Sequence, residues 1–184
     1  ELGLTLNFEP NDFTQVNADI NEKMIQKAMD LLEVTEQDRV LDLFCGLGNF
    51  SLPMAKRAGE VVGVEGDEAL VRHAQQNAAL NNLENAIFEQ ADLSKTTLKE
   101  YDWSQAGFNK VLLDPPRSGA FEVLPQLAEL GAQRIVYVSC NPATLARDAG
   151  ELVNQLGYKL LSAGIMDMFP HTSHVESIAI FEKQ

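Results

Sequence analysis

Five short apolar runs, separated by longer stretches with helical periodicity, constrain the fold of this chain more than any other feature. Runs such as VLL and IVYV lack polar alternation, which is typical of parallel strands buried on both faces. Strands that alternate with helices predict a parallel sheet with crossover helices. The predicted strands cover residues 39–43, 60–65, 86–90, 110–114 and 134–138.

Helices are predicted between these strands and before the first of them. Residues 20–32 form an amphipathic helix with an apolar face of Met24, Ile25, Ala28, Leu31 and Leu32. Asp67 is placed to cap a second helix that runs to about residue 80. Two more helices are predicted over residues 50–58 and 143–156, the latter ended by Gly157.

The last part of the chain predicts two further strands around Phe169, Pro170 and His171. The final run, residues 175–181, is expected to pair antiparallel at one edge of the sheet. Seven strands and their helices predict an α/β chain with a Rossmann-like, doubly wound and mostly parallel sheet. We expect a single domain over residues 1–184.

Charge and cysteine content exclude several classes of protein. The 184 residues carry a net charge of −13, which argues against a broad phosphate-binding surface, since such surfaces need Lys and Arg. Cys45 and Cys140 are the two cysteines, too few for a disulfide framework or a cysteine metal site. No secretory leader or membrane-spanning run is seen, so we expect a cytoplasmic protein without a resident metal or membrane contact.

The carboxyl ends of the first two strands point to a nucleoside site. Gly46 and Gly48 follow the first strand and permit a tight turn with close backbone approach. Glu65 ends the second strand 23 positions after Asp42, a spacing that suits a carboxylate on ribose hydroxyls. A dinucleotide site usually has a third glycine, whereas this chain has Ser51 at that place.

The run VLDLFCGLGNFSL, residues 40–52, resembles the first motif of class I S-adenosylmethionine methyltransferases. The resemblance implies S-adenosylmethionine as cofactor, with its methionine part held around Phe44, Gly46 and Asn49. It implies that Glu65 binds the ribose and that Asp92 faces the adenine. For Asp92 a local cap of the next segment is an equal alternative.

Two later strand ends carry residues suited to chemistry. The run DPPRSG begins at Asp114, and its two prolines fix an extended turn that includes Arg117. The run VSCNP places Cys140 after the fifth strand. A free cysteine is commonly a buried structural residue, but the following helix start and Arg117 could lower the thiol pKa, as a nucleophile requires.

Together LDPPRSG, VSCNP, the later PHTSHVES and the early FTQVN resemble the RNA 5-methyluridine methyltransferase family. The ending looks most like the branch that acts on bacterial 23S ribosomal RNA, and less like the transfer-RNA branch. The resemblance implies that Cys140 adds to carbon 6 of uracil and that Glu176 removes the carbon 5 proton. His174 is an alternative base.

The same resemblance assigns the remaining polar residues. Asp114 serves the substrate base or the cofactor amino group, and Gln15 contacts the cofactor. Arg117 holds an enolate oxygen or an RNA phosphate. Cys45, in the cofactor loop, is interpreted as a packing residue. No obligate protein partner is expected.

Full-length members usually carry an N-terminal RNA-binding domain, and some hold an iron–sulfur cluster. Neither is visible in this sequence, so we expect both to lie outside this chain if the enzyme has them. One alternative is an adenine amino-methyltransferase, but such enzymes have an aromatic residue where this chain has Arg117. Another is an RNA 5-methylcytidine methyltransferase, but such enzymes have a second cysteine near the double proline, and this chain has none there. A dinucleotide oxidoreductase and a silent scaffold are the remaining alternatives.

Overall fold

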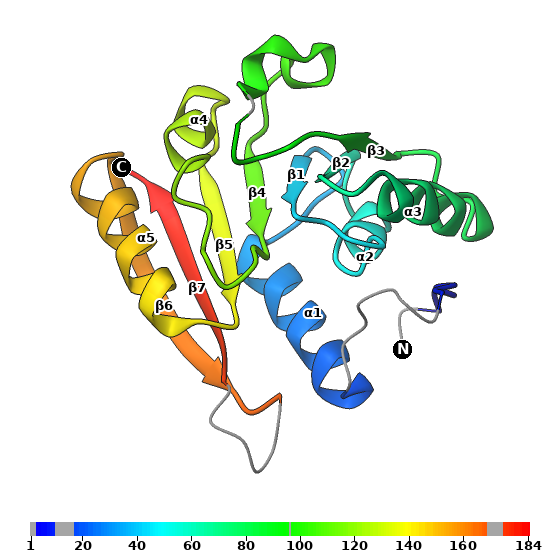
Figure 1. Cartoon of the computed structure of the whole chain (residues 1–184), viewed down its shortest axis with the longest axis horizontal. Helices are drawn as coiled ribbons and strands as arrows, with labels where there is room; N and C mark the ends of the chain where they lie inside the picture. The colour runs from blue at the N-terminus through cyan, green and yellow to red at the C-terminus, as the bar shows by residue number, and fades with distance from the viewer. Residues whose placement is uncertain (1–2, 10–16, 96, 169–174) are drawn as a thin grey trace.

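The computed structural model of the chain describes residues 3–9, 17–95, 97–168 and 175–184. In this part of the chain seven strands form one sheet, in the order β3-β2-β1-β4-β5-β7-β6 (Figure 1). The strands are β1 (Arg39–Leu43), β2 (Glu60–Glu65), β3 (Ala86–Gln90), β4 (Lys110–Leu113), β5 (Arg134–Ser139), β6 (Tyr158–Met166) and β7 (Glu176–Lys183). The helices are α1 (Ala18–Leu32), α2 (Ser51–Ala55), α3 (Glu68–Leu80), α4 (Leu124–Glu129) and α5 (Pro142–Asn154), with 3₁₀ turns η1 (Leu98–Glu100) and η2 (Asp102–Ser104).

The predicted fold class is confirmed, with one correction to the strand order. Strands β1 to β5 are parallel, and β7 is antiparallel as expected. However, β7 lies one place in from the edge, between β5 and β6, and β6 is the edge strand. The crossover through α5 makes β6 run in the same direction as β5. The last strand then fills the space between them and pairs antiparallel with both.

Local sequence explains where the helices begin. Asp67 caps α3 by accepting hydrogen bonds from the backbone N–H groups of Ala69 and Leu70, as predicted. Asn141 caps α5 in the same way, and Pro142 occupies its first turn, where the missing N–H has no cost. The short helix α4 has too few residues for a clear helical period, and the sequence pattern did not predict it.

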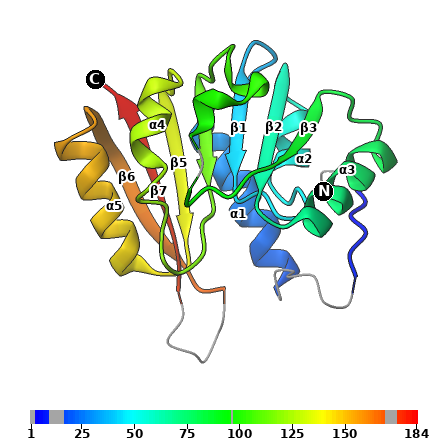
Figure 2. The ribbon, with the colours of Figure 1, turned by 45° about the horizontal axis from the view of Figure 1, so that its top comes forward.

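The central strands β1, β2, β4 and β5 are buried on both faces, because their successive side chains point to opposite sides and helices cover both. The edge strand β6 is mostly exposed. Val40, Val61 and Leu112 pack with α1 on one face. Leu41, Val62 and Val111 pack in the cluster that includes α4 and α5 on the other. Figure 2 shows α4 and α5 in front of the strands and α1 behind them. None of the helices in the described ranges is long and apolar enough to cross a bilayer.

The strand order reverses direction at β1, which pairs with β2 on one side and with β4 on the other. In doubly wound sheets such a switch point opens a crevice beyond the carboxyl ends of the strands. The loops after β1, β2, β4 and β5 all leave the sheet at this edge. The fold therefore brings together the motifs that are far apart in the sequence.

Candidate active site

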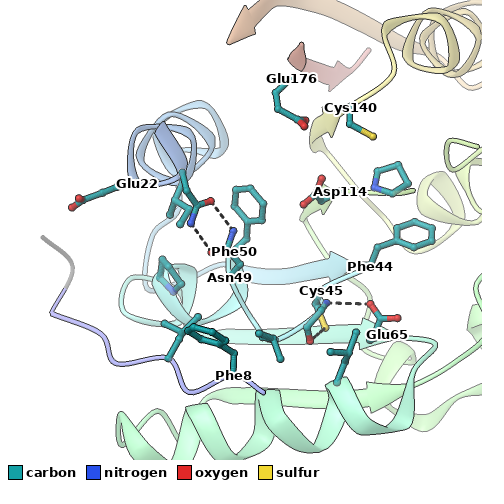
Figure 3. Close-up of a pocket in the computed structure, with 18 of the residues that line it drawn as sticks. Phe8, Glu22, Phe44, Cys45, Asn49, Phe50, Glu65, Asp114, Cys140 and Glu176 are labelled. Atoms are coloured by element: carbon teal, nitrogen blue, oxygen red, sulfur yellow. Dashed lines mark hydrogen bonds between the residues drawn. The ribbon is translucent and has the colours of Figure 1, made fainter. Parts of the chain in front are cut away.

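A cavity of about 1090 Å³ lies at the carboxyl edge of the sheet, large enough for a nucleoside cofactor and part of a second ligand. It is lined by the loop after β1, the ends of β2, β4 and β5, the start of β7, helix α1 and the segment 3–8 (Figure 3). Among the predicted site residues, the lining includes Phe44, Gly46, Asn49, Glu65, Asp114, Arg117, Cys140 and Glu176.

The glycine loop after β1 is bent sharply toward β2. The backbone N–H groups of Phe44 and Cys45 both donate to the carbonyl oxygen of Val64, at 2.9 and 3.2 Å. Phe44 has a φ of 64°, rare for a residue with a side chain. Gly48 has a φ of 90°, and a Cβ there would meet Leu52 at 3.1 Å and Phe88 at 3.2 Å. The second glycine is therefore needed both for its conformation and for space.

Glu65 joins this loop to the end of β2. One carboxylate oxygen accepts from the N–H of Gly46 at 3.1 Å, and the other from the N–H groups of Gly66 and Asp67 at 2.7 and 3.1 Å. A carboxylate has about four acceptor positions, so at least one remains for a ligand hydroxyl. The carboxylate is held at the cavity wall before any ligand arrives.

Helix α1 forms a wall that the sequence analysis missed. Asn21 and Asn49 exchange two side-chain hydrogen bonds of 3.0 Å, which tie α1 to the glycine loop (Figure 3). Asn21, Glu22 and Ile25 line the cavity beside that pair. The helix itself was predicted from its apolar face, but its exposed polar face gave no sign of facing a site.

The segment 3–9 forms another missed wall, held along α3 by side-chain amides. Asn77 accepts from the N–H of Asn7 at 2.8 Å and donates to its carbonyl at 3.0 Å. Asn81, one turn later, does the same with Thr5 at 2.9 and 2.7 Å. The helix thus pairs with an extended backbone much as a strand would.

This docking turns the apolar side of the segment toward the cavity. Leu4, Leu6 and Phe8 line it, and Leu4 and Leu6 also pack against the buried cluster beneath α3. Their alternation with polar residues was a visible signal of an extended, one-sided segment. Asn77 also donates to the carbonyl of Leu47 at 3.4 Å, which links the segment to the glycine loop.

Cys140, Asp114 and Glu176 lie together at the other end of the cavity (Figure 3). Ser139 pairs with Ser177 in the antiparallel register of β5 and β7. Cys140 and Glu176 are the chain neighbours of that pair, and both line the cavity. Residues 36 positions apart in the sequence therefore face the same space, with Asp114 reaching it from the end of β4.

The pKa of the Cys140 thiol is raised above its ordinary value, which corrects the expectation of a lowered one. Burial is the largest cause, followed by the negative charge of Glu176, and Asp114 acts in the same direction. The Arg117 guanidinium lowers the pKa as predicted, but its effect is outweighed. In the ligand-free protein this cysteine therefore holds its proton more tightly than a free thiol does.

Three carboxyl groups around the cavity also hold protons unusually well. Burial raises the pKa of Asp114 to about 8, with a further contribution from Glu176. Burial also raises the pKa of Glu176, which is 4% exposed. Asp42 is fully buried beneath the glycine loop with a pKa of about 7, and it accepts from the Ser51 hydroxyl. The sequence analysis had used Asp42 only as a marker of spacing.

Asp92 is the described site prediction that the structure does not bring to the cavity. Its carboxylate accepts from the Ser94 hydroxyl at 2.6 Å and from Lys95 at 2.9 Å. These contacts lower the pKa of Asp92 to about 2. These contacts match the alternative of a local cap of the segment that follows Asp92. The contact between Asp92 and the adenine stays a prediction. Gln15 and His174 lie outside the described residues.

Cys45 is buried, with 5% exposure, and packs against Gly63 and Phe88. Burial raises its pKa well above the ordinary value, which fits the packing role expected of it. Within residues 3–9, 17–95, 97–168 and 175–184, no three or more His, Cys, Asp or Glu side chains are arranged so that they could hold a metal ion.

The residues at the first end of the cavity fit S-adenosylmethionine. The bent glycine loop admits close backbone contact, and Glu65 presents a fixed acceptor for ribose hydroxyls. The second end carries a thiol between two carboxyl groups that bind protons strongly. This arrangement suits a nucleophile with a nearby proton acceptor.

Known proteins resemble this chain over nearly its whole length. The family profile described as tRNA (Uracil-5-)-methyltransferase matches residues 3–184. The 23S rRNA (uracil(1939)-C(5))-methyltransferase RlmD of Alkalilimnicola ehrlichii is 62% identical over 182 residues, which cover 99% of this chain and 41% of that protein. RlmD of Pseudomonas aeruginosa is 62% identical over 97% of this chain and 39% of its own length.

Solved structures give the same fold. The Pyrococcus abyssi tRNA (uracil-54, C5)-methyltransferase, in complex with S-adenosyl-L-homocysteine, superposes with a TM-score of 0.81 at 34% identity, over 98% of this chain and 43% of that one. TYW2 of M. jannaschii in complex with AdoMet, at 20% identity and a TM-score of 0.68 over 98% of this chain and 87% of that one, supports the fold alone. The chain spans about two fifths of the length of the curated relatives it matches.

Proposed function

The chain belongs to the tRNA (uracil-5-)-methyltransferase family, and on that premise we propose that it methylates carbon 5 of a uridine in RNA. S-adenosylmethionine is the methyl donor and 23S ribosomal RNA the substrate. The observation that carries the proposal is the meeting of Cys140, Glu176 and Asp114 at one end of a cavity whose other end fits the cofactor. A rival amino-methyltransferase needs no thiol at this place.

The cofactor is held by the loop around Phe44, Gly46 and Asn49 and by Glu65. When bound, S-adenosylmethionine supplies an electrophilic methyl group on a positively charged sulfur. Asp42 and Asp114, whose pKa values burial raises to about 7 and about 8, can ionise in response, because a nearby positive charge lowers the pKa of a carboxyl. Asp114 is placed to contact either the cofactor amino group or the uracil ring.

Cys140 makes carbon 5 of uracil nucleophilic. Its thiolate forms a bond to carbon 6, and the electron pair of the 5,6 double bond moves toward the carbonyl oxygen at carbon 4 as an enolate. The thiol must first lose its proton, which passes to solvent, because Glu176 has to stay ionised to take the carbon 5 proton later. Arg117 is the cation placed to stabilise the enolate oxygen or an RNA phosphate.

The same carboxylate completes the reaction. After methylation carbon 5 carries both a methyl group and a proton. Glu176, which lies beside Cys140 at one end of the cavity, removes that proton as the bond between sulfur and carbon 6 breaks. The double bond reforms and Cys140 leaves as a thiolate, so no oxidant or reductant is required. His174 remains the alternative base.

The choice of RNA rests on the relatives and on charge. RlmD proteins of about 60% identity support 23S ribosomal RNA, and transfer RNA is the alternative that the Pyrococcus abyssi structure supports. With a net charge of −13, this chain is poorly suited to hold an RNA backbone by itself. We therefore assign most of the RNA-binding affinity, and any iron–sulfur cluster, to parts of the protein outside this chain.

The assigned compartment is the cytoplasm, where the proposed substrate and cofactor occur together. The two free cysteines support a reducing environment. A gel-shift titration of the 184-residue chain with RNA should show weak and unselective binding. Tight and selective binding would contradict the proposal that most of the RNA-binding affinity lies outside this chain.

Trapping with 5-fluorouridine tests the reaction directly. Fluorine cannot leave carbon 5 as a proton does, so the protein, cofactor and a 23S fragment with 5-fluorouridine at the target should form a stable adduct on a denaturing gel. Peptide mapping should place it on Cys140, and Cys140→Ala should abolish it. A matched transfer-RNA fragment decides between the two substrates. An adduct on another residue, or full activity of Cys140→Ala, would refute the mechanism.

Two further variants decide which residue is the base. Glu176→Gln should let the methylated adduct accumulate even on ordinary uridine RNA, because the carbon 5 proton then stays in place. His174→Gln should turn over normally. The opposite pattern would transfer the role to His174.

A further inference from the structure

We propose that Asp148, a buried residue of α5, is a positioning residue that anchors the loop 117–120 and thereby holds Arg117 near the Cys140 thiol. This inference rests on the proposed role of Cys140. It adds to that role a residue on the far side of the loop, away from substrate and cofactor. The case comes from the hydrogen bonds that join α5 to the loop.

Asp148 is completely buried, and both of its carboxylate oxygens are engaged. One oxygen accepts from the N–H of Ala120 at 2.8 Å and from the Tyr137 hydroxyl at 2.6 Å. The other accepts from Arg147 at 2.8 and 2.7 Å. A buried carboxylate costs free energy unless it is paired and hydrogen-bonded. Its position between β5, the loop and α5 therefore indicates a specific structural task.

The loop is fastened to α5 at nearly every residue. The Arg117 carbonyl accepts from the Asn141 amide at 3.0 Å and from the Thr144 hydroxyl at 3.3 Å. The Ser118 carbonyl accepts from Arg147 at 2.9 Å. Together with the bond from Ala120 to Asp148, three of the four residues in the loop have a backbone group bound to this one helix.

Gly119, between these contacts, permits the close approach. Its φ is 85°, and a Cβ there would lie 2.6 Å from both an Arg147 nitrogen and an Asp148 oxygen. No other residue type fits without moving the loop away from α5. Gly119 and the buried carboxylate are two parts of one close contact.

The same helix begins at Pro142, two residues after Cys140, so it places the thiol and the loop relative to each other. Around the thiol, Glu176 approaches from β7, Asp114 from the end of β4 and Arg117 from the loop. Of these three charged groups, Arg117 alone favours the thiolate. A loop that moves away from α5 leaves the thiol facing two carboxyl groups, and the thiolate becomes harder to form.

The test follows the pH dependence of Cys140 alkylation by iodoacetamide, read by peptide mapping, in the protein without cofactor or RNA. Asp148→Asn and Gly119→Ala should both slow alkylation near pH 8 by about three- to tenfold, because each unit of pKa changes the thiolate fraction about tenfold. Gly119→Ala changes no charge, so it isolates the effect of loop position. Asp102→Asn, at an exposed position in η2, is the matched control and should leave the rate unchanged.

Arg117→Gln separates positioning from general loosening of the structure. In that background neither Asp148→Asn nor Gly119→Ala should slow alkylation further, since the cation they misplace is gone. Thr144→Val, which removes one loop contact and leaves the buried network intact, should cause a smaller shift in the same direction and guards against unfolding of the other variants. An unchanged alkylation profile in the folded variants, or a full shift that persists without Arg117, would overturn the proposal. Because the assay needs no RNA, its failure would leave the trapping result untouched.

Discussion

Replacing Asn77 by Ala should weaken cofactor binding although residue 77 does not line the cavity. Its side chain makes two hydrogen bonds to Asn7 and one to the Leu47 carbonyl. At about 0.5–1.5 kcal/mol per bond, the two bonds to Asn7 contribute about 2 kcal/mol to docking of the segment 3–9. The gain in helix propensity when Asn is replaced by Ala is smaller than this loss of hydrogen-bond free energy. The segment 3–9 should therefore detach from α3 more often.

A loss of about 2 kcal/mol corresponds to roughly a thirtyfold shift in the docking equilibrium. Leu4, Leu6 and Phe8 would then leave the cavity wall, and Leu47 in the glycine loop would lose a tether. We expect the dissociation constant for S-adenosylhomocysteine to rise by about ten- to thirtyfold. With cofactor at saturation the turnover number should stay near that of the wild type, because the thiol end of the cavity is unaffected.

Calorimetric titration with S-adenosylhomocysteine measures the change in affinity. Chymotrypsin cleavage at Phe8 reports detachment of the segment, and the cofactor should suppress it. Gln76→Ala, the preceding and exposed position of the same helix, is the control, and Asn81→Ala should show an intermediate effect. If Asn77→Ala lowers thermal stability yet binds the cofactor as tightly as Gln76→Ala, the reasoning about the wall is wrong.

Two predictions concern protons. Asp42 has a pKa of about 7 in the folded protein against about 4 when unfolded, so its protonation stabilises the fold at low pH and this stability is lost as the pH rises from 4 to 7. Asp42→Asn should remove about 2.6 kcal/mol of the difference in unfolding free energy between pH 5 and pH 8, measured by urea unfolding, and an equal difference in both proteins would contradict it. Asp114, with a pKa of about 8, should ionise near the sulfonium charge. If the charge lowers that pKa by one unit, the affinity ratio of S-adenosylmethionine to S-adenosylhomocysteine should rise about fivefold between pH 7 and 9. A ratio that rises equally in Asp114→Asn would refute the assignment.

The elements and motifs were predictable because they depend on local pattern. Apolar runs marked the parallel strands, and Asp67 and Gly157 marked helix ends, since capping and periodicity act over a few residues. The rule that parallel strands share a carboxyl edge then placed Gly46, Glu65, Asp114 and Cys140 together. The family resemblance added the roles that pattern alone could not assign.

The sequence by itself determined which residues stand at the strand ends and the kind of sheet that gathers them. Only the tertiary structure decided that β7 lies between β5 and β6, which brings Glu176 to the same end of the cavity as Cys140. Packing alone also showed that the segment 3–9 completes the cavity and that burial raises the pKa of Cys140 despite Arg117. The physical reason is range: periodicity and capping are fixed by neighbours along the chain, whereas desolvation and charge interactions depend on groups that folding brings from elsewhere.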